Sequence, residues 1–247
     1  MPTSHPSPRK RNISRWLLII VVGMLGWGGW REYSFCSALR QAKALGWRVE
    51  YIPSDPLGSI KKNWRATFKR ATWMSFVEVV DIPDNPPVPP DLAIVVKLNP
   101  RALFIRDAEK IRDLSALNRL SRIEDLRIFE GTQLTDVDWI KGFSRLKSLD
   151  LSRCNEIKSI DSLRGLSALR ELSLAHCYQL THLDALTDLK ALEKVEIIHC
   201  WKISNVDGLM KLNPRCRIFL YEPKGLPKER IAALKAAFPN AEIRESP

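Results

Sequence analysis

The chain has 247 residues, of which 45% are hydrophobic and 27% are charged, so it can fold around a core. This composition excludes collagen-like, mucin-like and fully disordered chains. Lysine and arginine (39) exceed aspartate and glutamate (28), but residues 1–70 hold 13 basic and 3 acidic side chains, whereas residues 71–247 hold 26 and 25. Neutralising phosphates needs a clustered basic surface, so we expect no nucleic-acid partner for the balanced C-terminal region.

An uncharged run from Trp16 to Trp30 follows a polar, basic tail at residues 1–15. As a helix the run would be about 22 Å long, somewhat short of a ~30 Å hydrocarbon layer. Tryptophans at both edges are typical of the two interfaces of a membrane-spanning segment. We therefore predict a basic cytoplasmic tail at 1–15 and a transmembrane signal-anchor at 16–31. Two alternatives are a cleaved signal peptide and a buried soluble helix, although four glycines disfavour the latter.

The basic residues before this run favour a cytoplasmic N-terminus and place the rest of the chain outside the cytoplasm. Basic residues that follow the run weaken this bias. The alternative is a cytoplasmic-facing or soluble scaffold that is held at the membrane surface by a basic amphipathic helix.

Residues 32–76 are interpreted as a juxtamembrane or N-terminal cap region. The pattern predicts a helix over 37–45 that is closed by Gly46, a strand over 47–52, and a second helix that starts at Ser59. On that second helix the basic side chains lie off the apolar stripe, where they would contact anionic lipid or remain in water while the helix caps the next domain. The predicted lipid-contacting residues are Lys61, Lys62, Arg65, Lys69 and Arg70.

Self-similarity at a period of 23 residues dominates the chain after residue 75. Three consecutive blocks begin at Leu146, Leu169 and Leu192, and each matches the others at eight apolar or cysteine positions. The alternating L-x-L part of each block predicts a short strand with one buried face. The following apolar residues, three apart, predict a tight helical or 3₁₀ return. One such unit cannot cover its own core, so neighbouring units must stack.

The unit L-x-x-L-x-L-x-x-C resembles that of leucine-rich-repeat proteins, and the looser C-terminal units look like those of bacterial, membrane-anchored members of that family. The resemblance covers 77–245, is strongest over 100–214, and implies an α/β solenoid with a parallel concave sheet. Residues 215–245 are expected to form a C-terminal cap that includes a helix near Lys228–Phe238. The family implies a non-catalytic module that binds a protein or peptide through its concave face.

Three cysteines, Cys154, Cys177 and Cys200, are spaced by one repeat and are expected to be buried, stacked thiols that donate to backbone carbonyls. His176 and His199 precede two of these cysteines and are expected to be neighbours on an exposed turn. Two imidazoles make a weak metal site, so we predict neither a metal nor a cofactor. The chain has no nucleophile motif and no phosphate-binding glycine loop, so we predict that it is not an enzyme.

The residues that flank the strand leucines form three columns on the face predicted to be concave. Aromatic and arginine side chains are typical anchors of binding surfaces. An alternative for Phe104 and Phe219 is that they merely cover the two ends of the stack. The predicted partner-binding residues are Phe104, Arg106, Arg127, Phe129, Asp150, Glu171, Lys194, Glu196, Ile198, Phe219 and Tyr221.

Overall fold

A computed structural model describes residues 33–52, 76–84 and 90–245. The predicted membrane span at 16–31 and the predicted lipid-contacting residues of 61–70 lie outside these ranges. Within them, none of the helices is long and apolar enough to cross a bilayer.

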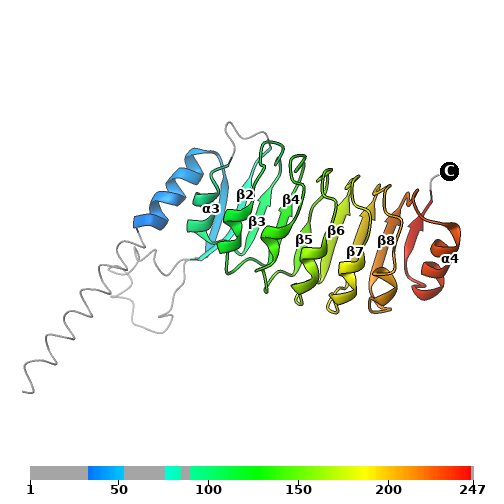
Figure 1. The fold of residues 1–247 in the computed structure, drawn as a ribbon. Helices are drawn as coiled ribbons and strands as arrows, with labels where there is room; N and C mark the ends of the chain where they lie inside the picture. Colours follow the sequence, from blue (N-terminus) through cyan, green and yellow to red (C-terminus); the bar gives the residue numbers. More distant parts are fainter. Residues whose placement is uncertain (1–32, 53–75, 85–89, 246–247) are drawn as a thin grey trace, which may run out of the picture.

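The described chain winds into a solenoid whose strands form one nine-stranded sheet in sequence order (Figure 1). From β2 onward each strand is parallel to the next, and the register matches residues 23 apart from β3 to β8. This is the arrangement that the repeat predicts. The strands are β1 (Arg48–Ile52), β2 (Phe76–Ile82), β3 (Ala102–Ile105), β4 (Asp125–Ile128), β5 (Ser148–Asp150), β6 (Glu171–Ala175), β7 (Lys194–Ile198), β8 (Arg217–Tyr221) and β9 (Glu242–Arg244).

Short helices lie along one side of the sheet, one per repeat, and the core lies between the sheet and these helices (Figure 1). Alternate strand residues such as Leu126, Leu149 and Leu172 are at most 1% exposed. Their neighbours in sequence face away from the core, which leaves one face of the sheet open. The helices are α3 (Leu92–Leu98) and the 3₁₀ helices η2 (Ser115–Arg119), η3 (Asp138–Ile140), η4 (Asp161–Gly165), η5 (Asp184–Asp188) and η6 (Leu209–Lys211).

The N-terminal part begins with a helix at 33–44 that ends as predicted at Gly46. Gly46 has a φ of +76°, and its N–H donates to the carbonyl of Lys43 while that of Trp47 donates to Ala42. This pair of bonds is the Schellman motif that a left-handed glycine permits. The predicted strand follows as β1, which pairs antiparallel with β2 and so forms one edge of the sheet.

The C-terminal part continues the parallel sheet through β8 and β9, and α4 (Lys228–Ala237) lies between those two strands in the chain. The bounds of α4 differ by one residue from those of the helix predicted at Lys228–Phe238. Neither Phe104 nor Phe219 covers an end of the stack, so that alternative is wrong. Two strands lie beyond β3, which contains Phe104, and β9 lies beyond β8, which contains Phe219.

In the repeats of β4 to β8 the chain turns sharply just after the strand through a residue with positive φ that is not glycine. Its N–H donates to a carbonyl one repeat later, as Arg153 does to Ala175 at 2.7 Å and His176 to Ile198 at 2.8 Å. These bonds extend the ladder of the sheet beyond the strands. The left-handed residues in this column are Glu130, Arg153, His176, His199 and Glu222.

The repeat cysteines come directly after these turns and are buried, as predicted. The thiols of Cys154, Cys177 and Cys200 donate to the carbonyls of Ile128, Leu151 and Leu174 at 3.7, 3.3 and 3.0 Å. Each bond reaches back across one repeat boundary, so the column ties neighbouring units together. Burial raises the pKa of Cys154 to about 12, which keeps this thiol protonated.

Candidate functional site

The strand register places the predicted binding residues in columns on the open sheet face. Asp81, Phe104, Arg127 and Asp150 occupy equivalent positions in β2 to β5. Neighbouring members of a column lie on paired strands, and parallel strands are about 4.8 Å apart. The column continues through Ser173, Glu196, Phe219 and Glu242.

Four of the predicted residues, Phe104, Arg106, Arg127 and Phe129, line a hollow of about 630 Å³ on this face, which we name the face hollow. Small side chains lie beside the large ones, and a volume of this size is usual for a ligand site. The other residues that line it are Asp84, Glu130, Ser152, Arg153, Ala175 and His176.

Carboxylates and aromatic rings hold the arginines of the face hollow in place. Arg106 donates through Nε and Nη2 to the two oxygens of Asp81, at 2.8 Å each, and this pair explains how Asp81 can be only 8% exposed. Arg127 donates in the same way to Asp125 at 3.2 and 3.0 Å, and its guanidinium lies 4.8 Å from the centre of the Phe104 ring. Because these side chains are already ordered, a ligand would lose little side-chain entropy by contacting them.

Asp150 lies beside this hollow, one strand beyond Arg127 in the same column. Its carboxylate accepts from the backbone N–H of Ser152 at 3.0 Å and from the Ser152 hydroxyl. Burial raises the pKa of Asp150, and the two Ser152 bonds and the charge of Arg127 only partly oppose that rise. The face therefore holds a partly desolvated carboxylate next to its arginine cluster.

The remaining predicted residues lie farther along the same face, outside the face hollow. Lys194 pairs with Glu196 at 2.7 Å and lies 5.5 Å from the centre of the Phe219 ring. The Tyr221 hydroxyl donates to Glu242 at 2.7 Å. Glu171 and Ile198 occupy the register positions beside Lys194 and Tyr221.

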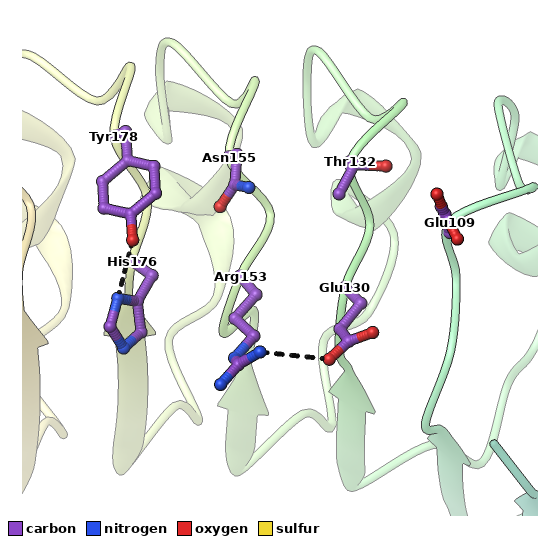
Figure 2. A pocket seen from close by; sticks show the side chains of 7 residues that line it. All are labelled: Glu109, Glu130, Thr132, Arg153, Asn155, His176 and Tyr178. Atoms are coloured by element: carbon purple, nitrogen blue, oxygen red, sulfur yellow. Dashed lines mark hydrogen bonds and ion pairs between the residues drawn. The ribbon is translucent and has the colours of Figure 1, made fainter.

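A second hollow of about 420 Å³ lies at the rim where the strands end, and we name it the rim hollow (Figure 2). Arg153 donates to Glu130 at 3.3 Å, and the Tyr178 hydroxyl lies 3.0 Å from Nδ1 of His176. Glu130, Arg153 and His176 also line the face hollow, so the two hollows are neighbours. The rim hollow is lined by Glu109, Glu130, Thr132, Arg153, Asn155, His176 and Tyr178.

Aromatic rings continue the rim beyond this hollow. His176 and His199 stack with their centres 4.8 Å apart, as their spacing predicts, and Tyr178 stacks on Trp201 at 4.9 Å. The ammonium group of Lys224 lies 4.7 Å from the centre of the Trp201 ring. In the part of the chain that the structure describes, His, Cys, Asp and Glu side chains form no group of three that could hold a metal ion.

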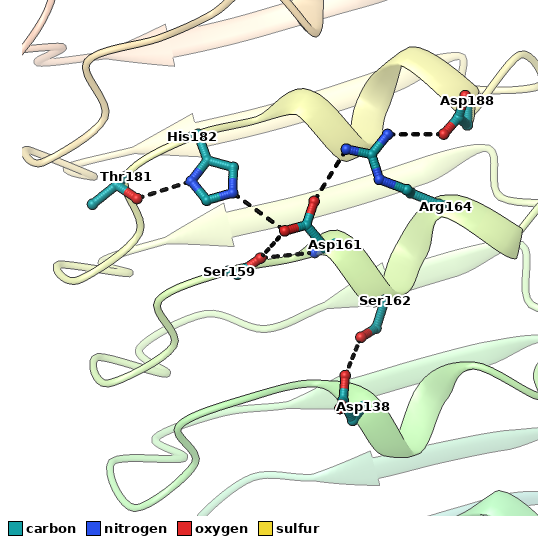
Figure 3. A network of polar contacts seen from close by, with 8 residues as sticks. All are labelled: Asp138, Ser159, Asp161, Ser162, Arg164, Thr181, His182 and Asp188. Carbon is teal, nitrogen blue, oxygen red and sulfur yellow. Dashed lines mark hydrogen bonds and ion pairs between the residues drawn. The ribbon is translucent and has the colours of Figure 1, made fainter.

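A third polar cluster lies on the helix side of the solenoid (Figure 3). Asp161 accepts from Ser159 at 2.7 Å and from Arg164 at 3.2 Å, and it lies 3.3 Å from Nε2 of His182. These bonds lower the pKa of Asp161, with the Ser159 bond contributing most. Since His182 belongs to the next repeat, the cluster links consecutive units, and we assign it to the stability of the stack.

Sequence reasoning missed most of the rim hollow. Glu109, Thr132, Asn155 and Tyr178 are spaced by 23 residues, and that spacing was the available signal. They are four different residue types, so the column does not stand out beside the repeated leucines. Glu130 and Arg153 were missed for the same reason.

Comparison with known protein families assigns a family to one segment of the chain. Residues 103–177 match a family model described as R13L1/DRL21 leucine-rich repeats. These residues therefore belong to a leucine-rich-repeat segment. Comparison with curated proteins gave no match.

Several solved structures are similar to the chain at low identity. Internalin F of Listeria monocytogenes is 20% identical over 49% of this chain, with a TM-score of 0.40, and the chain spans 35% of that protein's length. Internalin C2 of the same species is 18% identical over 72% of this chain and 83% of its own, with a TM-score of 0.47. A leucine-rich-repeat protein of Leptospira interrogans is 12% identical over 61% of this chain and 56% of its own, with a TM-score of 0.23. All three scores lie below 0.5, so the fold assignment depends on the repeat itself.

Proposed function

We propose that this leucine-rich-repeat protein binds an extended segment of a protein partner across its open sheet face, without catalysing a reaction. The face hollow is the observation that carries this proposal. It combines Phe104 and Phe129 with arginines that are already oriented, and buried aromatic and arginine contacts dominate the free energy of many protein interfaces.

The charge of the face hollow supports a peptide more than a nucleic acid. Asp81 and Asp125 neutralise Arg106 and Arg127, and Glu130 pairs with Arg153. A polyanion would gain little there, whereas a peptide that carries charges of both signs and an apolar side chain finds partners for each. The column from β3 to β8 extends roughly 25 Å at the spacing of parallel strands, enough for a segment of about seven extended residues.

The test is a selection of random peptides against the full chain, followed by affinity measurements with variants. Arg127→Ala should weaken the selected peptides by at least about tenfold, since removal of an interface arginine commonly costs more than about 1.4 kcal/mol. Ala175→Phe should weaken them as well, because it places a ring in the face hollow. The matched control is Arg145→Ala, whose exposed arginine lies in the turn before β5.

Equal affinity of the selected peptides for the wild type, Arg127→Ala and Ala175→Phe would contradict the proposal. A selection that enriches no peptide would contradict it as well. Thermal unfolding by circular dichroism shows whether each variant keeps the fold, so a loss of binding can be separated from a loss of structure.

We further propose that residues 16–31 anchor the chain in a membrane and that the repeats lie outside the cytoplasm. The uncharged run between Arg15 and Arg31 supports the anchor. Alkaline carbonate extraction should leave the protein in the membrane pellet, and its release would contradict the anchor. Protease added to intact cells should remove a C-terminal tag. If the tag survives until lysis, the cytoplasmic-facing scaffold with its basic helix at 59–70 replaces this topology.

A further inference from the structure

The rim hollow has a chemistry that the face hollow lacks. Each of its seven lining side chains carries a hydrogen-bonding group, and none is aliphatic. Glutamates accept, the arginine donates, and the threonine, asparagine, histidine and tyrosine can do either. Donors and acceptors therefore line the same open depression.

The charge of the rim hollow is close to balanced. Glu130 is paired with Arg153, and Glu109 adds one negative charge at the far end of the depression (Figure 2). Desolvation lowers the pKa of His176, and the neighbouring His199 and Arg153 lower it further, so this imidazole is neutral at physiological pH. A strongly anionic ligand would find no net positive field here, so an uncharged polar ligand fits better.

An aromatic platform borders the hollow at its other end. Tyr178 belongs to the lining, is fixed by its bond to His176 and stacks on Trp201, whose ring is 42% exposed. Among the described residues, Tyr33 is the other large apolar side chain that is strongly exposed. A pyranose ring matches this arrangement, because its C–H face packs on the negative face of an aromatic ring while its hydroxyls reach polar groups at the edge.

From these three features we propose that the rim hollow is a binding site for a neutral oligosaccharide. One sugar ring packs on Tyr178, which Trp201 supports by stacking on it. Asn155 and Thr132 bond to its hydroxyls, and the Glu130–Arg153 pair bonds to the next ring. The site shares Glu130, Arg153 and His176 with the face hollow. The lining residues Tyr178, Asn155, Thr132 and Glu109 belong to the rim hollow alone, so variants at these positions test it separately from the proposed peptide site.

The test is saturation-transfer NMR of the full chain with four named probes. Maltotriose, cellotriose and triacetylchitotriose are neutral, and a heparin tetrasaccharide is polyanionic. We expect transfer to at least one neutral probe. Tyr178→Ala should weaken that probe by at least about tenfold, since it removes one aromatic stacking partner. Asn155→Ala should weaken it by a smaller factor.

Tyr33→Ala is the matched control, since it removes an exposed aromatic ring on the helix at 33–44 and should leave the probe's affinity unchanged. Three results would overturn the proposal: no transfer to any neutral probe, transfer to the heparin probe alone, or transfer that survives both Tyr178→Ala and Asn155→Ala. Thr132→Ala gives a second assay of the same site if Tyr178→Ala fails to fold. Peptides selected on the face hollow should bind Tyr178→Ala normally, so failure of one proposal is distinguishable from failure of the other.

Discussion

Two glycines at the ends of 3₁₀ helices, neither with a positive φ, should respond to the same substitution with opposite signs. Gly208 caps η6 with φ −60° and ψ −38°, and Gly165 is the last residue of η4. Alanine tolerates helical angles, so replacing glycine gains up to about 1 kcal/mol at either position if space permits. The surroundings decide the outcome.

Space is present at Gly165 and absent at Gly208. An added methyl carbon at Gly165 would meet nothing within 4 Å, whereas at Gly208 it would lie 1.9 Å from the carbonyl oxygen of Leu183 and 3.3 Å from Cα of Asp184. Those are backbone atoms of the preceding repeat, so no side-chain rotation relieves the overlap. Overpacking costs about 3 kcal/mol or more when the backbone must move, which leaves a net loss of about 2 kcal/mol or more for Gly208→Ala.

Thermal unfolding followed by circular dichroism measures both effects. In a chain of this size 1 kcal/mol corresponds to about 2–4 °C, so Gly208→Ala should lower Tm by about 4–8 °C or more. Gly165→Ala should raise Tm by up to about 4 °C. If Gly208→Ala melts at or above the wild-type temperature, the close contact between the two repeats is not present, and the reasoning fails.

Three further predictions follow from titratable groups that are partly or fully buried. Asp150→Asn should raise Tm at neutral pH, because burial raises the pKa of Asp150 and so penalises its charged form, and the gain should vanish as pH falls through that raised pKa. The pKa of His176 is lowered on folding, so protonation of this side chain destabilises the wild type as pH falls below about 6.5. His176→Asn removes this group and should therefore lose less stability than the wild type over the same pH range, which Tm measured against pH tests. A maleimide should label Cys36, which is half-buried, much faster than Cys154 or the other buried thiols, and rapid labelling of two or more sites by mass spectrometry would contradict the burial.

The sheet and its register could be predicted because only one arrangement of the repeats buries their apolar side chains. Leu149, Leu172 and Val195 recur every 23 residues and must face the same core, so their neighbours must face the same open surface. The pairing of β1 could not be predicted. The strand predicted over 47–52 is present as β1. However, a long segment separates it from β2, and its sequence pattern does not indicate that it pairs antiparallel with that strand.

The hollows are less visible in the sequence because they depend on differences between repeats. In the column at the C-terminal ends of the strands, side-chain volume falls from Phe129 to Ser152 and Ala175 and rises again at Ile198. Because the backbone is regular, that local minimum in side-chain volume produces a depression, and the face hollow includes Phe129, Ser152 and Ala175.

The rim hollow depends on a feature that the repeat pattern does not reveal. This feature is a left-handed turn occupied by Glu130, Arg153 and His176, where glycine or asparagine would be expected. A non-glycine residue in that conformation costs about 1 kcal/mol or more, which the interstrand N–H bond of each turn helps to offset. The turn thus holds ordinary, chemically varied side chains in one column, and binding chemistry can change from repeat to repeat while the stack beneath it does not.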